Sequence, residues 1–316
     1  MPTYRAFIDA IATQFRQAGL SYGHGTTNAD DEAAWLVLHA AGQAFEILPE
    51  LLDRVAPQDV LRQATRLAKR RVSERIPMAY LLNEAWLGDH RFYVDDRVIV
   101  PRSYLAELLR LRLRPWVQPA RIRRILDLCT GSACLAIIAS EAFPKALVDA
   151  VDLSSDALAV ARKNVSLHRL QDRIRLLQSD LFSALNGEQY DLILTNPPYV
   201  LDRVMQKLPE EYRREPVMAL AGGKSGLDLI SPILRQSADH LTDNGWLFME
   251  TGHARPAVVR RHPQIEFIWP LTSGGDDCVL AVQTEQLKQA QRPVQSSPRP
   301  SVKRHRARSV AKPDRA

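Results

Sequence analysis

The stretch Tyr190-Asp-Leu-Ile-Leu-Thr-Asn-Pro-Pro-Tyr199 joins a short apolar run to an abrupt proline stop. Its apolar half, from Tyr190 to Leu194, is typical of a buried strand. Pro197 and Pro198 fix φ and cannot donate backbone hydrogen bonds, so the strand must end and a stiff loop must follow. In an open α/β sheet, ligands bind outside the carboxyl ends of the strands, where this loop would lie. The stretch therefore predicts a parallel sheet with a ligand site at its edge.

The groups in this loop suit a planar amino group. The side-chain oxygen of Asn196 and the carbonyl of Pro197 can each accept one N–H proton, and Tyr199 offers an aromatic face. A strand end capped by prolines, without any binding role, is the simpler explanation of a bare Pro-Pro-Tyr sequence. The motifs elsewhere in the chain decide between these two interpretations.

From Arg121 onward, apolar runs alternate with helical patterns. Strands separated by helices favour an α/β fold with a doubly wound, mostly parallel sheet. The predicted strands are residues 122–126, 146–151, 174–177, 190–194, 246–250, 267–269 and 278–282.

The rest of the chain predicts four regions. Residues 1–80 have helical periodicity and form an N-terminal helical domain, in which Lys69-Arg70-Arg71 is interpreted as a solvated helix end. Residues 81–102 form a linker with a β-hairpin, whose strands are expected at 92–94 and 98–100. Residues 103–287 form the α/β domain. Residues 288–316 are a basic tail, and disorder is predicted from about Gln286 because little there can be buried.

Composition excludes several classes of protein. Apolar residues make up 46% and charged residues 25% of the 316 residues, as in ordinary soluble globular proteins. No apolar run approaches the roughly 20 residues that span a bilayer, and three cysteines make neither a disulfide framework nor a zinc spacing. We therefore expect a cytoplasmic protein without a metal site. Nine Lys/Arg and one acid give the tail a charge of +8, so the body carries −2 although the whole chain carries +6.

A second motif, Asp127-Leu-Cys-Thr-Gly131-Ser-Ala-Cys-Leu-Ala-Ile137, predicts a strand, a turn of small residues and a helix. Gly131 lets the backbone approach a ligand closely. A dinucleotide-binding turn has three glycines around a pyrophosphate, whereas this turn has one and carries Ala133 at a position that is usually glycine. The turn suits a ligand without a pyrophosphate. The residues expected to bind it are Asp127, Cys129, Thr130, Gly131, Ser132 and Ala133.

Acidic residues follow the next two predicted strands. Asp152 lies 21 positions after Gly131, and a carboxylate at about this spacing binds ribose hydroxyls. Asp180 can accept a hydrogen bond from the exocyclic amine of adenine, with Leu181 covering the ring and Leu153 as a further contact. Either acid alone could be a helix N-cap. Acids at successive strand ends, combined with the turn and the Asn-Pro-Pro-Tyr loop, favour S-adenosylmethionine as cofactor, an adenosine without phosphates, and methyl transfer to nitrogen.

These motifs resemble those of the class I S-adenosylmethionine-dependent methyltransferases, and among them the protein-(glutamine-N5) methyltransferases. The resemblance covers about residues 1–287. Outside the two motifs it rests on Arg75-Ile-Pro-Met-Ala-Tyr80, Glu84-Ala-Trp-Leu-Gly88, Arg91-Phe-Tyr-Val-Asp95, Val98-Ile-Val-Pro-Arg-Ser103, Leu208-Pro-Glu-Glu-Tyr-Arg-Arg-Glu-Pro216 and Gly226-Leu-Asp228. These stretches look like the branch that modifies ribosomal protein L3. The release-factor branch has an acidic Pro-Arg-Pro-(Asp/Glu)-Thr-Glu stretch where this chain has Pro101-Arg-Ser-Tyr-Leu-Ala-Glu107.

The resemblance implies a class I methyltransferase fold with a seven-stranded sheet and an N-terminal domain that recognises the substrate. It implies that Asn196 and Pro197 hold the amide of a substrate glutamine, with Pro198 and Tyr199 beside them. The chain departs from the family pattern at Asn83, Tyr104, Ala133 and His253, where glycine, proline, glycine and asparagine are usual.

Three alternatives stay open from the sequence. A release-factor glutamine methyltransferase would share the same motifs. An adenine-N6 or guanine-N2 nucleic-acid methyltransferase would hold a flipped base in the same loop, although the −2 body disfavours it. A ribosome- or RNA-binding module without catalysis would use the basic tail, which could also bring an enzyme into contact with rRNA.

Overall fold

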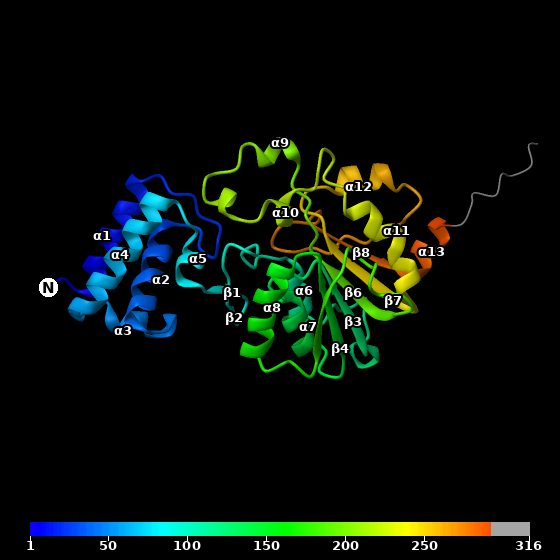
Figure 1. Ribbon diagram of the computed structural model, residues 1–316, viewed down its shortest axis with the longest axis horizontal. Coiled ribbons are helices and arrows are strands. Elements are labelled where there is room, and N and C mark those ends of the chain that lie inside the picture. Colours follow the sequence, from blue (N-terminus) through cyan, green and yellow to red (C-terminus); the bar gives the residue numbers. More distant parts are fainter. Residues whose placement is uncertain (292–316) are drawn as a thin grey trace, which may run out of the picture.

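The computed structural model describes residues 1–291, in which a bundle of helices lies beside a larger α/β region (Figure 1). The sheet contains β3 (Arg124–Leu128), β4 (Leu147–Asp152), β5 (Ile174–Gln178), β6 (Tyr190–Thr195), β7 (Leu241–Glu250) and β8 (Val279–Gln283). Their order across the sheet is β5-β4-β3-β6-β7-β8, and only β8 is antiparallel to its neighbour. The predicted doubly wound α/β fold is confirmed.

From β3 the chain adds β4 and β5 on one side of the sheet, and then returns to add β6 and β7 on the other side of β3. Strands β3 and β6 pair in parallel, with Leu128 opposite Thr195, so the loops that follow them begin side by side. This is the switch point at which doubly wound sheets bind ligands. It brings the Gly131 turn next to Asn196, although 65 residues separate them in the chain.

The sheet has six strands rather than the seven expected. Residues 267–269 form only a single bridge, in which Ile268 exchanges two backbone hydrogen bonds with Ala281. Pro270 follows directly and has no N–H group to extend the ladder. The segment therefore runs along the edge of β8 without becoming a strand.

Helices cover both faces of the sheet. On one face lie α6 (Leu105–Arg110), α7 (Cys134–Ala142) and α8 (Ser155–Leu167). On the other lie α11 (Ile230–His240), α12 (Arg255–Arg261) and α13 (Thr284–Gln291). The central strands are buried on both sides, which explains why their sequences read as continuous apolar runs.

Helix α13 corrects the prediction that disorder begins near Gln286. Leu287 is fully buried against the core, and the Thr284 hydroxyl lies within hydrogen-bond distance of the Thr242 and Gly245 carbonyls. This packing holds a polar segment in a helix. The rest of the predicted basic tail, residues 292–316, lies outside the described residues.

The N-terminal region is a bundle of helices, as predicted. It consists of α1 (Tyr4–Gln17), α2 (Ala29–Ala41), α3 (Leu48–Leu51), α4 (Gln58–Glu74) and α5 (Met78–Leu82), with a 3₁₀ turn at Phe45–Ile47. Side chains of Thr3 and Asn28 cap the first two helices by accepting N–H groups three residues on. Phe15 and Leu36 are among the fully buried residues of its core.

The linker contains a hairpin, but not where it was expected. Strands β1 (Ala85–Leu87) and β2 (His90–Phe92) pair across a turn in which Gly88 has φ +59°. Residues 98–100 are not a strand. The Val98 carbonyl accepts from the Tyr80 hydroxyl, and the Val100 N–H donates to Glu215, so side chains take up these backbone groups.

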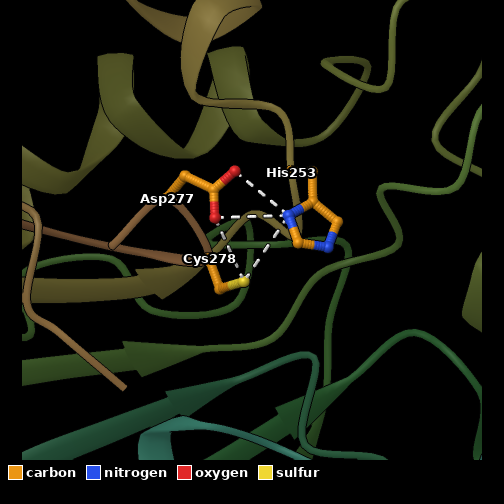
Figure 2. Close-up of side chains that lie close together, drawn as sticks. All are labelled: His253, Asp277 and Cys278. Carbon is orange, nitrogen blue, oxygen red and sulfur yellow. Dashed lines mark hydrogen bonds and ion pairs between the residues drawn. The ribbon is translucent and has the colours of Figure 1, made fainter. Parts of the chain in front are cut away.

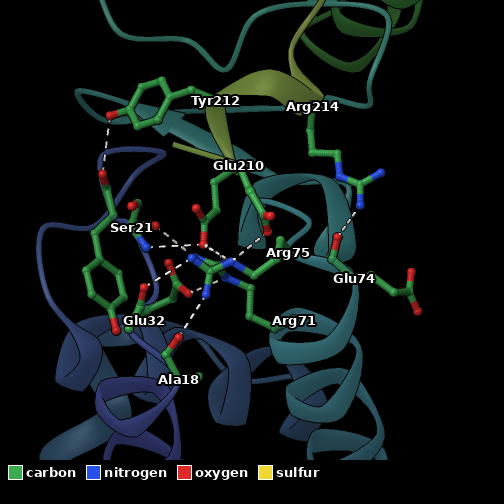
Figure 3. A network of polar contacts seen from close by, with 12 residues as sticks. Ala18, Ser21, Glu32, Arg71, Glu74, Arg75, Glu210, Tyr212 and Arg214 are labelled. Atoms are coloured by element: carbon green, nitrogen blue, oxygen red, sulfur yellow. Dashed lines mark hydrogen bonds and ion pairs between the residues drawn. The ribbon is translucent and has the colours of Figure 1, made fainter. Parts of the chain in front are cut away.

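The connection from β6 to α11, which we call the strap (residues 200–229), is anchored to the N-terminal bundle. It contains α9 (Asp202–Met205), a 3₁₀ turn at Tyr212–Arg214 and α10 (Val217–Leu220). Arg71 of α4 donates to Glu32 (2.7 Å) and to Glu211 of the strap (3.2 Å), and all three side chains are at least 98% buried (Figure 3). Arg75 adds an ion pair to Glu211 (3.1 Å). The interpretation of Arg71 as part of a solvated helix end is therefore wrong, whereas Lys69 and Arg70 are exposed.

Replacing Arg71 by methionine should lower the free energy of unfolding by about 3–5 kcal/mol, because Glu32 would stay buried without its cation and Glu211 would keep only Arg75. The matched control is Arg70→Met, which removes an exposed ion pair to Glu74 (2.9 Å) and should change stability by less than about 1 kcal/mol. Urea denaturation of both variants measures the difference. If both variants lost less than about 1 kcal/mol of stability, the buried cluster of Arg71, Glu32 and Glu211 would not be what holds the strap.

Candidate active site

A pocket opens at the carboxyl ends of four neighbouring strands. Its walls include Cys129 and Gly131 after β3, Asp152 and Leu153 after β4, Asp180 and Leu181 after β5, and Asn196 and Pro198 after β6. The linker contributes residues 97–99, and the strap contributes Pro216, Met218, Ala219 and Leu229. The fold thus brings eight of the predicted site residues to one cavity.

Four predicted cofactor residues lie behind this wall. Asp127, Thr130, Ser132 and Ala133 are all at most 5% exposed and do not line the pocket. Asp127 accepts from the Thr130 hydroxyl and from the Ala136 N–H. Burial raises the pKa of Asp127 to about 7 despite these hydrogen bonds. This carboxyl group ties the end of β3 to the start of α7 and so fixes the shape of the turn.

Asp152 connects two of the strand ends. One carboxylate oxygen accepts the Gly131 N–H (2.8 Å), and the other accepts the Ser154 N–H (2.9 Å). Burial raises the pKa of Asp152, and these backbone N–H groups oppose the shift. Each oxygen has a further lone pair, so Asp152 can still accept from a ligand in the pocket.

The Gly131 turn leaves room for a ligand. Gly131 has φ +54°, and a Cβ atom built on it would meet no atom within 4 Å. The side chains beside it are apolar and partly open, because Leu153 is 53% exposed and Met218 is 52% exposed. Asp180 is also exposed at this wall. The cavity therefore combines carboxylate acceptors with apolar surfaces that can cover a flat ring.

Part of the Asn-Pro-Pro-Tyr loop lines the pocket, and the backbone that follows the loop is fixed by hydrogen bonds. Asn196 and Pro198 face the pocket, whereas Pro197 and Tyr199 do not form its walls. The Val200 N–H donates to the Leu220 carbonyl, and the Gly222 N–H donates to the Val200 carbonyl. The strap therefore continues the loop in a fixed backbone arrangement.

Glu250, at the end of β7, holds Tyr199 in place. One Glu250 oxygen accepts the Tyr199 hydroxyl (2.9 Å), and the other accepts the Ser103 hydroxyl (2.6 Å) and the Tyr104 N–H (3.0 Å). Glu250 is 1% exposed, and burial raises its pKa although these hydrogen bonds favour the ionised form. Burial and the nearby Glu250 raise the pKa of the Tyr199 phenol well above its usual value, so this hydroxyl is a donor. The role of Glu250 was not predicted from the sequence.

Gly252 packs directly on the Tyr199 ring. A Cβ atom at position 252 would lie 2.7 Å from the ring atom Cε2, and Gly252 has φ +51°. A side chain here would push the ring away from Glu250.

Replacing Gly252 by alanine should therefore lower kcat by about 10- to 100-fold, since a displacement of about 1 Å at a site can cost this much. Gly88→Ala is the matched control, because Gly88 has φ +59° but open space around it. It should cost about 1–2 kcal/mol of stability through backbone strain and leave kcat unchanged. Methyl transfer and thermal unfolding of both variants test this. Equal activity losses would mean that contact with Tyr199 is not the cause.

Comparisons with known proteins show which family the chain is similar to. The model of the family Methyltransferase small domain matches residues 110–210. A ribosomal protein uL3 glutamine methyltransferase of Bordetella pertussis is 48% identical over 289 residues, which is 91% of this chain and 97% of that protein. Proteins of the same name from Neisseria meningitidis serogroup B and Xanthomonas campestris are 45% and 41% identical, over 91% and 89% of this chain and 95% and 92% of theirs.

The chain belongs to the ribosomal protein uL3 glutamine methyltransferase family. The matches of 284–289 residues are longer than the 101 residues of the small-domain match, so family membership includes most of the N-terminal helices. The resemblance inferred from the sequence is confirmed, and the chain is a methyltransferase.

A solved structure, of a methyltransferase from Pyrococcus furiosus, covers 71% of this chain and 98% of its own at 17% identity and a TM-score of 0.46. Among the helices within residues 1–291, none combines the length and the apolar character that crossing a membrane requires.

Proposed function

We propose that the protein transfers a methyl group from S-adenosylmethionine to the side-chain amide nitrogen of a glutamine in ribosomal protein uL3 (L3). The main support is the position of Asn196 in the same pocket as Asp152 and the Gly131 turn. The curated relatives that carry this activity in their names support the choice of substrate.

The pocket residues fit S-adenosylmethionine. Asp152 would accept from the ribose hydroxyls through its free lone pairs, and Asp180 would accept from the adenine amine. Leu153 and Leu181 would cover the ring, while the open space at Gly131 would admit the rest of the ligand. Asp127, Thr130, Ser132 and Ala133 would act indirectly by shaping the turn. When bound, the cofactor supplies an electrophilic methyl group on a positively charged sulfur.

The chain itself would hold and orient the acceptor nitrogen. An amide nitrogen is a poor nucleophile because its lone pair is delocalised. Asn196 Oδ1 and the Pro197 carbonyl would accept its two protons and aim it at the methyl group. These hydrogen bonds would strengthen as positive charge develops on the nitrogen, which lowers the barrier. Tyr199, fixed by Glu250, would confine the glutamine side chain from one side.

The regions of the chain would divide the task. Residues 1–80 would recognise the substrate protein, and residues 103–287 would bind the cofactor and catalyse methyl transfer. Residues 81–102 would link these two regions. The basic segment 288–316 would contact rRNA or the ribosome in the cytoplasm, where ribosomal proteins are made. Since α13 extends to Gln291, any such segment begins after that helix.

Two substitutions separate binding from catalysis. Asn196→Ala should reduce turnover by at least about 10³-fold, because it removes an acceptor that acts in the transition state. It should leave the Kd for S-adenosylmethionine within a few-fold of wild type. Asp152→Ala should instead raise this Kd by about 10- to 150-fold, since a hydrogen bond to a charged group is worth about 1.5–3 kcal/mol.

Isothermal titration with the cofactor and a methyl-transfer assay measure both effects. The exposed Asp156 on α8 serves as the control, and Asp156→Ala should change neither quantity. Loss of cofactor binding in Asn196→Ala would contradict the role given to this residue.

A further inference from the structure

His253, Asp277 and Cys278 converge between the end of β7 and the start of β8 (Figure 2). His253 follows β7, and the other two residues immediately precede β8. His253 Nδ1 lies 3.0 and 3.2 Å from the two Asp277 carboxylate oxygens and 3.9 Å from the Cys278 sulfur. The sulfur lies 3.6 Å from Asp277 Oδ1. Three different metal-binding atoms therefore face one another.

These separations match the edges of a tetrahedral zinc site. Zinc binds nitrogen and oxygen at about 2.0–2.2 Å and sulfur at about 2.3 Å, which places neighbouring ligand atoms about 3.3–3.6 Å apart. The observed distances are 3.2 Å from His253 Nδ1 to Asp277 Oδ1, 3.6 Å from Asp277 Oδ1 to Cys278 Sγ, and 3.9 Å from Cys278 Sγ to His253 Nδ1. Small movements of side chains alone would complete the geometry. Three protein ligands with an open fourth position are a common zinc arrangement.

The backbone holds the two turns in this position. The Thr251 N–H donates to the Cys278 carbonyl (2.8 Å), and Glu250 pairs with Val279 in the ladder of β7 and β8. The side chain of His253 is 76% exposed, so solvent can reach the fourth position. Cys278 is buried, and its thiol donates to the Gly274 carbonyl.

We propose that His253 Nδ1, an Asp277 carboxylate oxygen and Cys278 Sγ bind one zinc ion, with water as the fourth ligand. The thiol makes the site unsuited to magnesium or calcium, which prefer oxygen ligands. On binding, the sulfur–metal bond forms and the thiol proton passes to solvent. The sequence analysis predicted no metal site, because the ligands proposed here come from two turns that only the fold brings together.

The metal would stabilise the fold and would take no part in methyl transfer. It would join the turn after β7 to the turn before β8. Gly252 in the first turn packs on Tyr199, and Gly274 in the second packs on the Tyr104 ring. A bound ion would thus stiffen the support beneath the Asn-Pro-Pro-Tyr loop.

Cobalt(II) titration of the chelator-treated full-length protein tests the proposal without any activity measurement. We expect one equivalent to bind, with a thiolate-to-cobalt charge-transfer band and the intense visible bands of tetrahedral cobalt. Zinc should displace the cobalt. Cys278→Ser should abolish the charge-transfer band, while His253→Ala and Asp277→Asn should weaken binding at least 10-fold.

Two control variants should retain the signal. Cys134→Ser removes another thiol, and His90→Gln removes a histidine–carboxylate pair with Glu141 (2.7 Å). A charge-transfer band that survives Cys278→Ser, or its absence from the wild-type protein, would overturn the proposal. The cluster would then be an ion pair of His253 and Asp277 with a thiol bonded to Gly274. Circular dichroism of His253→Ala and Asp277→Asn, whose side chains reach the surface, excludes misfolding as the reason for lost binding.

Discussion

The parallel pairing of β3 with β6 places the Gly131 turn next to the Asn-Pro-Pro-Tyr loop. Because Leu128 stands opposite Thr195, the small-residue turn and the Asn-Pro-Pro-Tyr loop leave the sheet at neighbouring points. Asp152 then bonds the end of β4 to the Gly131 backbone, so three strand ends share one cavity. A shift of one residue in this register would turn the side chains of the shifted strand to the opposite face of the sheet.

A second constraint reaches this cavity from the N-terminal bundle. The strap forms one wall of the pocket, and its conformation depends on two buried carboxylates. Glu211 is held by Arg71 of α4, and Glu215 is held by Arg102 of the linker (2.6 Å). Burial alone would raise the pKa of Glu215, but hydrogen bonds and charge from Arg102 and His24 lower it to about 2. The carboxylate is therefore ionised at neutral pH. Through these contacts, the helices proposed to recognise the substrate are physically connected to the pocket in which the glutamine would react.

Local patterns in the sequence predicted most of the fold and half of the site. The apolar runs and their endings located all six strands of the sheet, the cofactor turn and Asn196, because these features depend on neighbouring residues. The predictions that failed concern features that depend on contacts with residues elsewhere in the fold. Residues 267–269 stop at a single bridge because Pro270 follows them, and residues 284–291 become helical because Leu287 packs on the core. The burial of Arg71 needed Glu211, 140 residues away. Nor could a sequence pattern reveal that Glu250 holds Tyr199, since the contact joins the ends of two strands.

The methyl acceptor that we propose is a glutamine amide of a ribosomal protein. The most direct measurement incubates the purified enzyme and labelled S-adenosylmethionine with extracts of cells that lack it, followed by separate protease and nuclease digestion. We expect label that resists nuclease, is released by protease and maps by mass spectrometry to a glutamine of uL3. Label that nuclease removes, or that maps to another protein such as a release factor, would show that uL3 is not the substrate.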